Sequence, residues 1–397
     1  KPGDSVGQNA GFAPTLDEVD WAHRILAALL RDLGATPVIN AAGNQTVIGG
    51  SRVSPAVQEA MIAANRYYVS MDELFHSTGE IIANLLGAEA AFVTPGCGAA
   101  LALSAAACMS VGNPERMEQL PHTDGMPNQF LFQTRQKYHY QRCLSVFGGR
   151  VVMVGNQNGT TAEQLEDSIT ELTAGIHYFA QGDPDDSILH LDNILTVAAR
   201  HDLPVTVDSA YQVYPLETMK GYAQTPNALM GFGAKYIGAC NSTGILCGKK
   251  ELVEAAYTHS FIGFETSDLE TVGRPLKLDR QEVVAVVVAL QEWMSMDHEA
   301  RIADHWRKAD HIESSLGGVA HLTTERHVED NSLSNGVMLI IDEEGLGKTA
   351  AQVVDELKAG DPSIWARATG NRLRIAVAHL IEDEVDIVID RVKKILT

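Results

Sequence analysis

Residues 231–248 read GFGAKYIGACNSTGILCG. A single lysine, Lys235, stands among glycines and alanines, although lysine normally occupies a solvated surface. Glycine permits tight turns and lets another group approach the main chain closely. The stretch therefore predicts either a tight turn or a place where a ligand lies against the backbone.

Two earlier stretches also place unusual residues where a predicted strand ends. In VTPGCGAALALSAAACM (93–109), a strand ends at Val93 and a helix starts near Ala99. The free N–H groups of that helix start, with Gly96 and Gly98, can bind an anion. In PVTVDSAY (204–211), Asp208 ends an apolar strand, where a carboxylate is costly unless paired. The alternatives are an ordinary strand-to-helix turn and a helix cap or buried ion pair.

The order of these three features matches what pyridoxal phosphate (PLP) requires of a protein. The phosphate would bind the helix start, Asp208 would pair with the pyridine nitrogen and keep it protonated, and Lys235 would form the Schiff base. The small residues would make room for a flat ring beside the backbone. Taken alone, Lys235 could equally be a loop lysine that reaches water.

Composition limits the classes of partner. The chain has 397 residues, enough for about two domains. Lys and Arg total 30 against 51 Asp and Glu, a net charge of −21, which disfavours nucleic acid and anionic membranes. We see no secretory signal and no membrane-spanning run, and the five cysteines form no C-x-x-C pair. We therefore expect a cytoplasmic protein with reduced thiols and a small-molecule substrate.

The order of predicted elements indicates an α/β fold. Residues 1–50 are expected to form an N-terminal arm whose helix begins with a capping box at Thr15 and Glu18. Short apolar strands alternate with helices over 51–279, which predicts a large domain with a mainly parallel sheet covered by helices on both faces. Residues 280–397 are expected to form a small α+β domain that opens with one long connecting helix.

Several longer motifs resemble one enzyme family from about residue 36 onward. They are VINAAGNQTVIGGSRVSPAVQEAM, MDELFHSTGEIIANLLGAEAAFVTPGCGAALALSAAACM, LPHTDGMPN, DLPVTVDSAYQVYP, GAKYIGACNSTGILCGKKELV, VGRPLKLDRQEVVAVVVAL and DPSIWARATGNRLRI. The chain resembles the selenocysteine-synthase-like branch of the fold-type-I PLP enzymes, and most closely the D-glucosaminate-6-phosphate ammonia-lyase-like proteins. The resemblance implies a seven-stranded-type sheet, PLP as cofactor, and a homodimer or larger homo-oligomer. A tRNA partner is rejected, because this chain has only a short arm and is strongly acidic.

The resemblance also implies roles for particular residues. Lys235 would be the Schiff-base lysine and Asp208 the partner of the ring nitrogen. The other cofactor-binding residues would be Gly96, Cys97, Gly98, Ala99, His139 and Ser242, with His139 an alternative to Tyr140 beside the ring. Tyr140 would be a catalytic acid. The substrate-binding residues would be Arg367, which clamps a carboxylate, together with Arg274, Lys277 and Arg52. No metal site is expected.

Three departures from the family pattern lie around the expected substrate-binding part of the site. Phe232-Gly233-Ala234 replaces the usual Ser-Gly-Gly, Ala239-Cys240-Asn241 replaces Gly-Pro-Gln, and Gln136 replaces a histidine. The predicted reaction is α,β-elimination of a small hydroxylated amino acid or amino-sugar acid to a 2-oxo acid and ammonia. The alternatives are β-replacement, transamination, racemisation, retro-aldol cleavage, and a non-catalytic protein with the same fold.

Other motifs have simpler interpretations. GLGKT (345–349) lacks the first glycine of a phosphate-binding loop, because that position is Asp342. We expect it to begin a helix instead. His298, His305 and His311 share one predicted helix without metal-ligand spacing. Cys97 and Cys240 are expected to be small packing residues, with a reactive thiol as the alternative.

Overall fold

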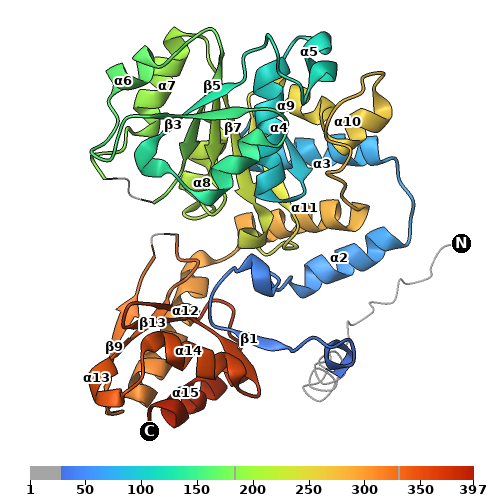
Figure 1. The fold of residues 1–397 in the computed structure, drawn as a ribbon. Coiled ribbons are helices and arrows are strands. Elements are labelled where there is room, and N and C mark those ends of the chain that lie inside the picture. The colour runs from blue at the N-terminus through green and yellow to red at the C-terminus, as the bar shows by residue number, and fades with distance from the viewer. Residues whose placement is uncertain (1–27, 183–184, 330) are drawn as a thin grey trace, which may run out of the picture. The chain divides into compact units, whose positions relative to one another are not determined.

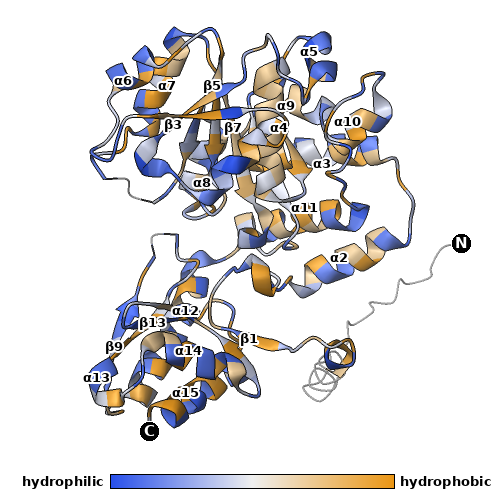
Figure 2. Cartoon of the chain, in the orientation of Figure 1, coloured by the Kyte–Doolittle hydropathy of each residue, from blue (hydrophilic) through white to orange (hydrophobic). Residues whose placement is uncertain are grey.

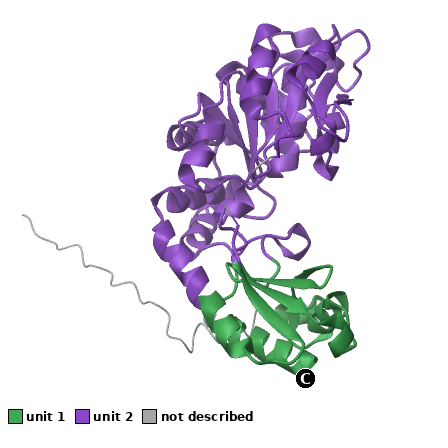
Figure 3. Cartoon of the chain, turned by 90° about the vertical axis from the view of Figure 1, so that its left-hand side faces the viewer, with its two compact units in different colours: residues 1–42, 308–326, 336–397 green, residues 43–307, 327–335 purple. Residues whose placement is uncertain are grey.

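The computed structural model describes residues 28–182, 185–329 and 331–397. Residues 28–32 are helical, and the remainder of the predicted N-terminal helix lies outside the described residues. The chain forms two compact units (Figure 3), which are described separately below. Among the described residues, unit 1 comprises 28–42, 308–326 and 336–397, and unit 2 comprises 43–182, 185–307, 327–329 and 331–335.

Unit 2 is built on a seven-stranded sheet of order β2-β8-β7-β6-β5-β3-β4. All neighbouring strands are parallel except β8, which is antiparallel to both β2 and β7. The strands are β2 (Ala90–Thr94), β3 (Gln129–Gln133), β4 (Arg150–Val154), β5 (Thr173–Phe179), β6 (Val205–Asp208), β7 (Ala228–Gly233) and β8 (Gly244–Gly248). The expected α/β fold with a mainly parallel sheet is confirmed.

Helices surround this sheet (Figure 1). The α-helices are α2 (Pro55–Asn65), α3 (Met71–Leu86), α4 (Gly96–Ser110), α5 (Pro114–Gln119), α6 (Ala162–Asp167), α7 (Leu191–Arg200), α8 (Leu216–Ala223), α9 (Lys250–Thr258), α10 (Phe261–Thr266) and α11 (Arg280–Ser295). The 3-10 helices are η1 (Thr46–Ile48), η2 (Thr134–Gln136), η3 (His139–Ser145) and η4 (Ala234–Ile237). Helix α12 (His298–Leu316) begins in unit 2 and continues into unit 1.

Helix α4 lies in the core of unit 2. It packs against β7 and β8 and also against α9, so nearly its whole circumference is buried. Its run of alanines, leucines and serines has no polar face, as expected of a helix covered on all sides, and Figure 2 shows it in pale to hydrophobic colours. Ser104 and Ser110 satisfy their hydroxyls on carbonyls one turn earlier.

Unit 1 contains two smaller sheets. Strand β1 (Val38–Asn40) pairs in parallel with β11 (Ser363–Trp365). The second sheet has the order β12-β13-β10-β9. Its strands are β9 (Leu322–His327), β10 (Gly336–Ile341), β12 (Arg367–Thr369) and β13 (Arg372–Ala376), and the accompanying helices are α13 (Glu343–Leu346), α14 (Ala350–Ala359) and α15 (Glu382–Leu396).

The prediction of a single long helix from residue 280 is wrong in one respect, because the structure divides this segment into α11 and α12. Met296 is extended, with φ −67° and ψ 141°, so the helical hydrogen bonds stop there. Asp297 then accepts a hydrogen bond from the Ala300 N–H at 2.9 Å, which starts a new helix. The aspartate at this point was the available sequence signal for the break.

Candidate active site

Strand register brings residues from distant parts of the sequence to one edge of the large sheet. Asp208, the last residue of β6, pairs with Phe179 of β5 and Gly231 of β7. Gly244, the first residue of β8, pairs with Gly233 of β7 and Thr94 of β2. Carboxyl ends of parallel strands are where open α/β sheets bind ligands. The antiparallel β8 contributes its amino end to the same edge.

A pocket of about 580 Å³ opens at this edge. It is strongly aromatic, and it brings the predicted phosphate turn, acid and lysine together in one cavity. The lining residues are Thr46, Pro95, Gly96, Cys97, Gly98, Leu101, Tyr138, His139, Tyr140, Phe179, Asp208, Ala210, Tyr211, Gly233, Lys235, Tyr236, Asn241, Ser242 and Thr243.

Lys235 lies on η4, directly after β7. Its Nζ donates a hydrogen bond to Thr46 Oγ1 at 2.8 Å and lies 5.1 Å from the centre of the Tyr236 ring. Partial burial lowers the pKa of Lys235, and Cys97 opposes that shift. A lysine with a depressed pKa has a larger neutral fraction at pH 7, as a nucleophile or base requires.

Asp208 is only 3% exposed. It accepts hydrogen bonds from the Tyr138 hydroxyl at 2.6 Å, the Ala210 N–H at 3.1 Å and the Cys97 thiol at 3.5 Å. Burial raises the pKa of Asp208, and these three donors act in the opposite direction. The Asp208 carboxylate thus lines the pocket, and the contacts that stabilise its negative charge are the hydrogen bonds from these three donors.

The start of α4 leaves backbone donors available. Its N-cap is Pro95, and no side chain caps the first turn. Gly96 has φ +81°, a left-handed conformation that favours glycine, and it turns the chain from β2 into the helix. The first N–H groups of a fifteen-residue helix, with the positive end of its dipole, make a site for an anion.

These observations fit PLP. The pocket holds a lysine of lowered pKa and a buried carboxylate for a protonated ring nitrogen, and uncapped helix N–H groups can receive a phosphate. Aromatic side chains provide flat walls for a ring. One expected contact fits less well, since Ser242 already donates its hydroxyl hydrogen to Glu282.

The other predicted site residues divide into two groups. His139 and Tyr140 line the pocket, with Tyr140 at its rim and 64% exposed. Arg52, Arg274 and Lys277 are exposed and are not among the pocket-lining residues of the described chain, and Arg274 pairs with Glu265. Arg367 belongs to unit 1, on β12, so its role stays a prediction.

Sequence reasoning missed Tyr138, His177 and Thr206. Tyr138 is the residue that contacts Asp208, although its neighbours His139 and Tyr140 were chosen. His177 and Thr206 are fully buried register partners on β5 and β6. Two polar residues at the same level of adjacent apolar strands were the signal that could have found them, because buried polar groups require partners.

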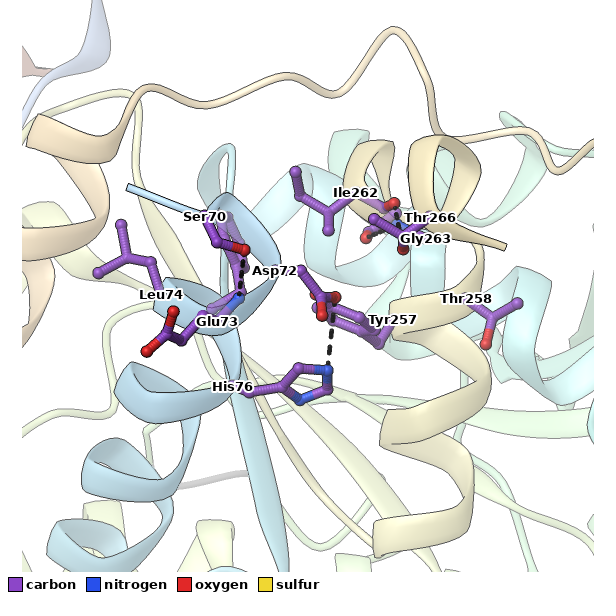
Figure 4. Close-up of polar contacts among 12 residues, drawn as sticks. Ser70, Asp72, Glu73, Leu74, His76, Tyr257, Thr258, Ile262, Gly263 and Thr266 are labelled. Carbon is purple, nitrogen blue, oxygen red and sulfur yellow. Dashed lines mark hydrogen bonds and ion pairs between the residues drawn. The ribbon is translucent and has the colours of Figure 1, made fainter. Parts of the chain in front are cut away.

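A second hollow, of about 560 Å³, lies along α3 and α9. There the Tyr257 hydroxyl donates to Asp72 Oδ1 at 2.8 Å, and His76 Nε2 lies 3.5 Å from the same carboxylate (Figure 4). These residues are unrelated to the predicted site. They repeat the Tyr–Asp combination of the main pocket and so provide a comparison for experiments.

The remaining motifs behave as packing and capping residues. Thr349 caps α14 through the Gln352 N–H, as expected for GLGKT. His298 is buried against the Trp293 carbonyl, and no cluster able to hold a metal ion occurs among the described residues. All five cysteines are free thiols. Within the described ranges, no helix has the length and apolar character needed to span a bilayer.

Comparison with known proteins supports the expected resemblance. The chain is 27% identical over 389 residues to the 5'-C-glycyluridine monooxygenase-decarboxylase of a Streptomyces species, covering 94% of this chain and 90% of the relative. It is 26% identical over 348 residues to the D-glucosaminate-6-phosphate ammonia lyase of Salmonella typhimurium (strain 14028s / SGSC 2262), covering 85% and 89% respectively. No protein-family model matches the chain.

Solved structures agree on the fold. A structure of D-glucosaminate-6-phosphate ammonia-lyase superposes with a TM-score of 0.81 at 24% identity, over 93% of this chain and 98% of that one. An aspartate aminotransferase of Thermus thermophilus superposes with a TM-score of 0.51 at 16% identity, over 97% of each chain. The chain therefore has the fold of the fold-type-I PLP enzymes, and its resemblance to D-glucosaminate-6-phosphate ammonia-lyase is confirmed.

Proposed function

We propose that this chain, with its fold-type-I architecture, is a PLP-dependent lyase for a small hydroxylated amino acid or amino-sugar acid. The overall reaction converts R–CH(OH)–CH(NH₂)–COOH into R–CH₂–CO–COOH and NH₃, with one water lost and one regained. The observation that carries the proposal is the convergence of Lys235, Asp208 and the uncapped start of α4 on one pocket. The ammonia lyase among the relatives supports this choice of reaction.

When bound, PLP supplies an aldehyde that condenses with amines and a ring that accepts electron density from a bond broken at Cα. Lys235 holds the cofactor in the resting protein. When the Lys235 amine is not holding the cofactor, it would remove the Cα proton of the substrate. Its lowered pKa favours the neutral form that can accept this proton. The Thr46 hydroxyl orients Nζ by accepting its hydrogen bond.

The other roles follow from chemistry. Asp208 holds the proton on the ring nitrogen. The uncapped N–H groups of Cys97, Gly98 and Ala99 bind the phosphate. The protonated Lys235 or the Tyr140 hydroxyl gives a proton to the departing β-hydroxyl. Arg367 pairs with the substrate carboxylate, and Arg274, Lys277 and Arg52 serve any second anionic group.

Two measurements test this proposal. The purified protein should show a visible absorption band with PLP, and borohydride should bleach it and leave the reduced cofactor on the peptide containing Lys235. A Lys235→Ala variant should lose both properties. Incubation with hydroxylated amino acids should then release ammonia and 2-oxo acid in equal amounts. A protein that stays colourless with added PLP contradicts the proposal.

A second candidate is favoured by the relative with the longer match, whose name describes a monooxygenase-decarboxylase. For this chain, we propose that a reaction of that type would convert R–CH(NH₂)–COOH and O₂ into R–CO–NH₂, CO₂ and H₂O. The same lysine and acid would serve, because both reactions break a bond at Cα. An oxygen electrode separates the candidates, since the lyase releases ammonia under argon whereas the oxygenase consumes O₂ and releases no ammonia.

We further propose a homodimer or higher homo-oligomer. Four large apolar side chains within eight residues of the sequence are exposed in the single chain, namely Ile62, Tyr67, Tyr68 and Val69, and Tyr68 is 96% exposed. Apolar patches of this kind often mark protein interfaces. A partner could also bring Arg274 and Lys277 to a neighbouring pocket. Sedimentation equilibrium would test the assembly, and a monomer at micromolar concentration would contradict it.

A further inference from the structure

A chain of hydrogen bonds leads from Asp208 into the interior of unit 2. The Tyr138 hydroxyl lies 2.6 Å from Asp208 Oδ2 and 3.1 Å from His177 Nε2. His177 Nδ1 in turn lies 2.9 Å from Thr206 Oγ1. His177 and Thr206 are both fully buried. The Tyr138 ring is held in place by stacking on Phe179, with centroids 4.3 Å apart and planes 12° apart.

The direction of these bonds follows from counting hydrogens. A phenol has one hydrogen, and Tyr138 gives it to the closer and charged Asp208. His177 Nε2 must then carry a hydrogen and donate it to the Tyr138 oxygen. Burial lowers the pKa of His177 to about 3, so the ring is neutral and Nδ1 is an acceptor. Thr206 therefore donates to Nδ1, and every bond in the chain points toward Asp208.

We propose that Thr206, His177 and Tyr138 are positioning residues that keep Asp208 ionised and thereby hold the ring-nitrogen proton on PLP rather than on the carboxyl group. This inference rests on the proposed function. Each donor in such a chain is strengthened by the donor behind it, because polarised hydrogen bonds are cooperative in a low-dielectric interior. The protonation state of the ring nitrogen would thus depend in part on His177 and Thr206, which do not line the pocket.

Among the titratable side chains around Asp208, Tyr138 belongs to this chain and the others cannot replace it. The titratable side chains that act on Asp208 or are acted on by it are Cys97, Cys143, Tyr138, Tyr211 and Tyr236. Burial raises the pKa of all five, so they are neutral at pH 7. None of them supplies positive charge. The carboxylate therefore depends on hydrogen-bond donors, of which Tyr138 is the closest.

The test loads PLP labelled with ¹⁵N at the ring nitrogen into wild type, Tyr138→Phe, Thr206→Val and Tyr257→Phe. Solid-state NMR of the ring nitrogen distinguishes the protonated from the neutral pyridine. Tyr257→Phe is the matched control, because it removes a tyrosine hydroxyl from an aspartate in the second hollow (Figure 4). Thr206→Val keeps the shape of a buried side chain, and Thr206 bonds to His177 and is not itself a pocket-lining residue.

Losing a donor to a charged acceptor shifts an equilibrium by about tenfold to hundredfold. We expect Tyr138→Phe to move the ¹⁵N signal toward the neutral form and to lower kcat at least tenfold with little change in KM. Thr206→Val should move both in the same direction by a smaller amount, and Tyr257→Phe should match wild type.

The outcomes separate this inference from the proposed function. Wild type that does not bind PLP overturns both. Wild type that binds PLP, with an unchanged ¹⁵N signal in Tyr138→Phe and Thr206→Val, overturns the positioning role alone. If Tyr138→Phe does not fold, the Thr206→Val signal decides, since this substitution removes only one buried hydroxyl. An equal shift in Tyr257→Phe would also overturn the inference, because the effect would then not depend on Asp208.

Discussion

Replacing Gly244 with alanine should displace the backbone at the start of α4, without removing any side chain that contacts a ligand. An ideal Cβ at Gly244 would lie 2.5 Å from the Gly96 carbonyl carbon, 2.7 Å from the Cys97 nitrogen and 2.8 Å from the Phe232 oxygen. Carbon atoms pack at about 3.5–4.0 Å, so these groups must separate by about 1 Å. All three are backbone atoms, so no rotamer change relieves the contact.

The expected cost is at the upper end of about 1–3 kcal/mol for an overpacked core position. Because α4 starts at Gly96, its first N–H groups must move relative to β8, and PLP affinity should fall at least tenfold. Urea unfolding of the apoprotein measures the first effect, and PLP titration measures the second. Gly221→Ala in α8 is the control, since no atom lies within 4 Å of its Cβ. It should be neutral or stabilise by about 0.5–1 kcal/mol.

A Gly244→Ala protein that unfolds at the wild-type urea concentration and binds PLP with wild-type affinity would refute this reasoning. A variant that loses PLP affinity but keeps wild-type stability against urea would agree with this reasoning only if the start of α4 had moved. A crystal structure of the variant would show whether Gly96 and Cys97 are displaced.

Three other substitutions give expected outcomes. Because the pKa of Asp208 is raised in the folded protein, the contribution of Asp208 to stability falls as pH rises above about 4. Asp208→Asn apoprotein should therefore gain stability relative to wild type at pH 7 and should lose that gain near pH 4, as measured by urea unfolding of both proteins at each pH. The pKa of His177 is lowered to about 3, so the contribution of His177 to stability falls as pH falls from about 6.5 toward 3. The difference in stability between wild type and His177→Gln should therefore change over this range, and parallel curves would contradict the assignment of a neutral buried imidazole. Arg367→Lys should raise KM about tenfold or more and change kcat less, because lysine cannot form the bidentate pair with a carboxylate; steady-state kinetics with unchanged KM would remove Arg367 from the substrate site.

Much of the fold could be predicted because its elements are encoded locally. Apolar runs such as 205–208 and 228–233 identify buried strands, and the glycine-rich turn after β2 identifies the start of α4. The antiparallel direction of β8 was not predicted. The signal for it lies in the connection, because residues 234–243 between β7 and β8 are too few for the crossover that a parallel neighbour requires. That signal becomes usable only once the two strands are known to be neighbours in the sheet.

The site was only partly predictable for a related reason. Lys235 and Asp208 stand out because a charged residue among small or apolar neighbours is unusual. Tyr138 does not, because a tyrosine in a loop is ordinary, and its contact with Asp208 arises from a separation of 70 residues. His177 and Thr206 become a pair only when β5 and β6 are placed side by side in the observed register.

The glycines around Lys235 have a second cause beside the one that the sequence suggested. Room for a flat ring stays a prediction, and Gly233 does line the pocket. In addition, Gly231 faces Cys97 and Ala100, and Gly233 faces the Tyr236 ring. Together with the contact of Gly244 on Gly96, these approaches bring the start of α4 and an aromatic wall close to the end of β7. These glycines therefore also serve the packing of the protein on itself. That packing places helix N–H donors, Asp208 and Lys235 around one pocket, so the demand for glycine holds in the apoprotein and should be visible in its stability before any ligand is added.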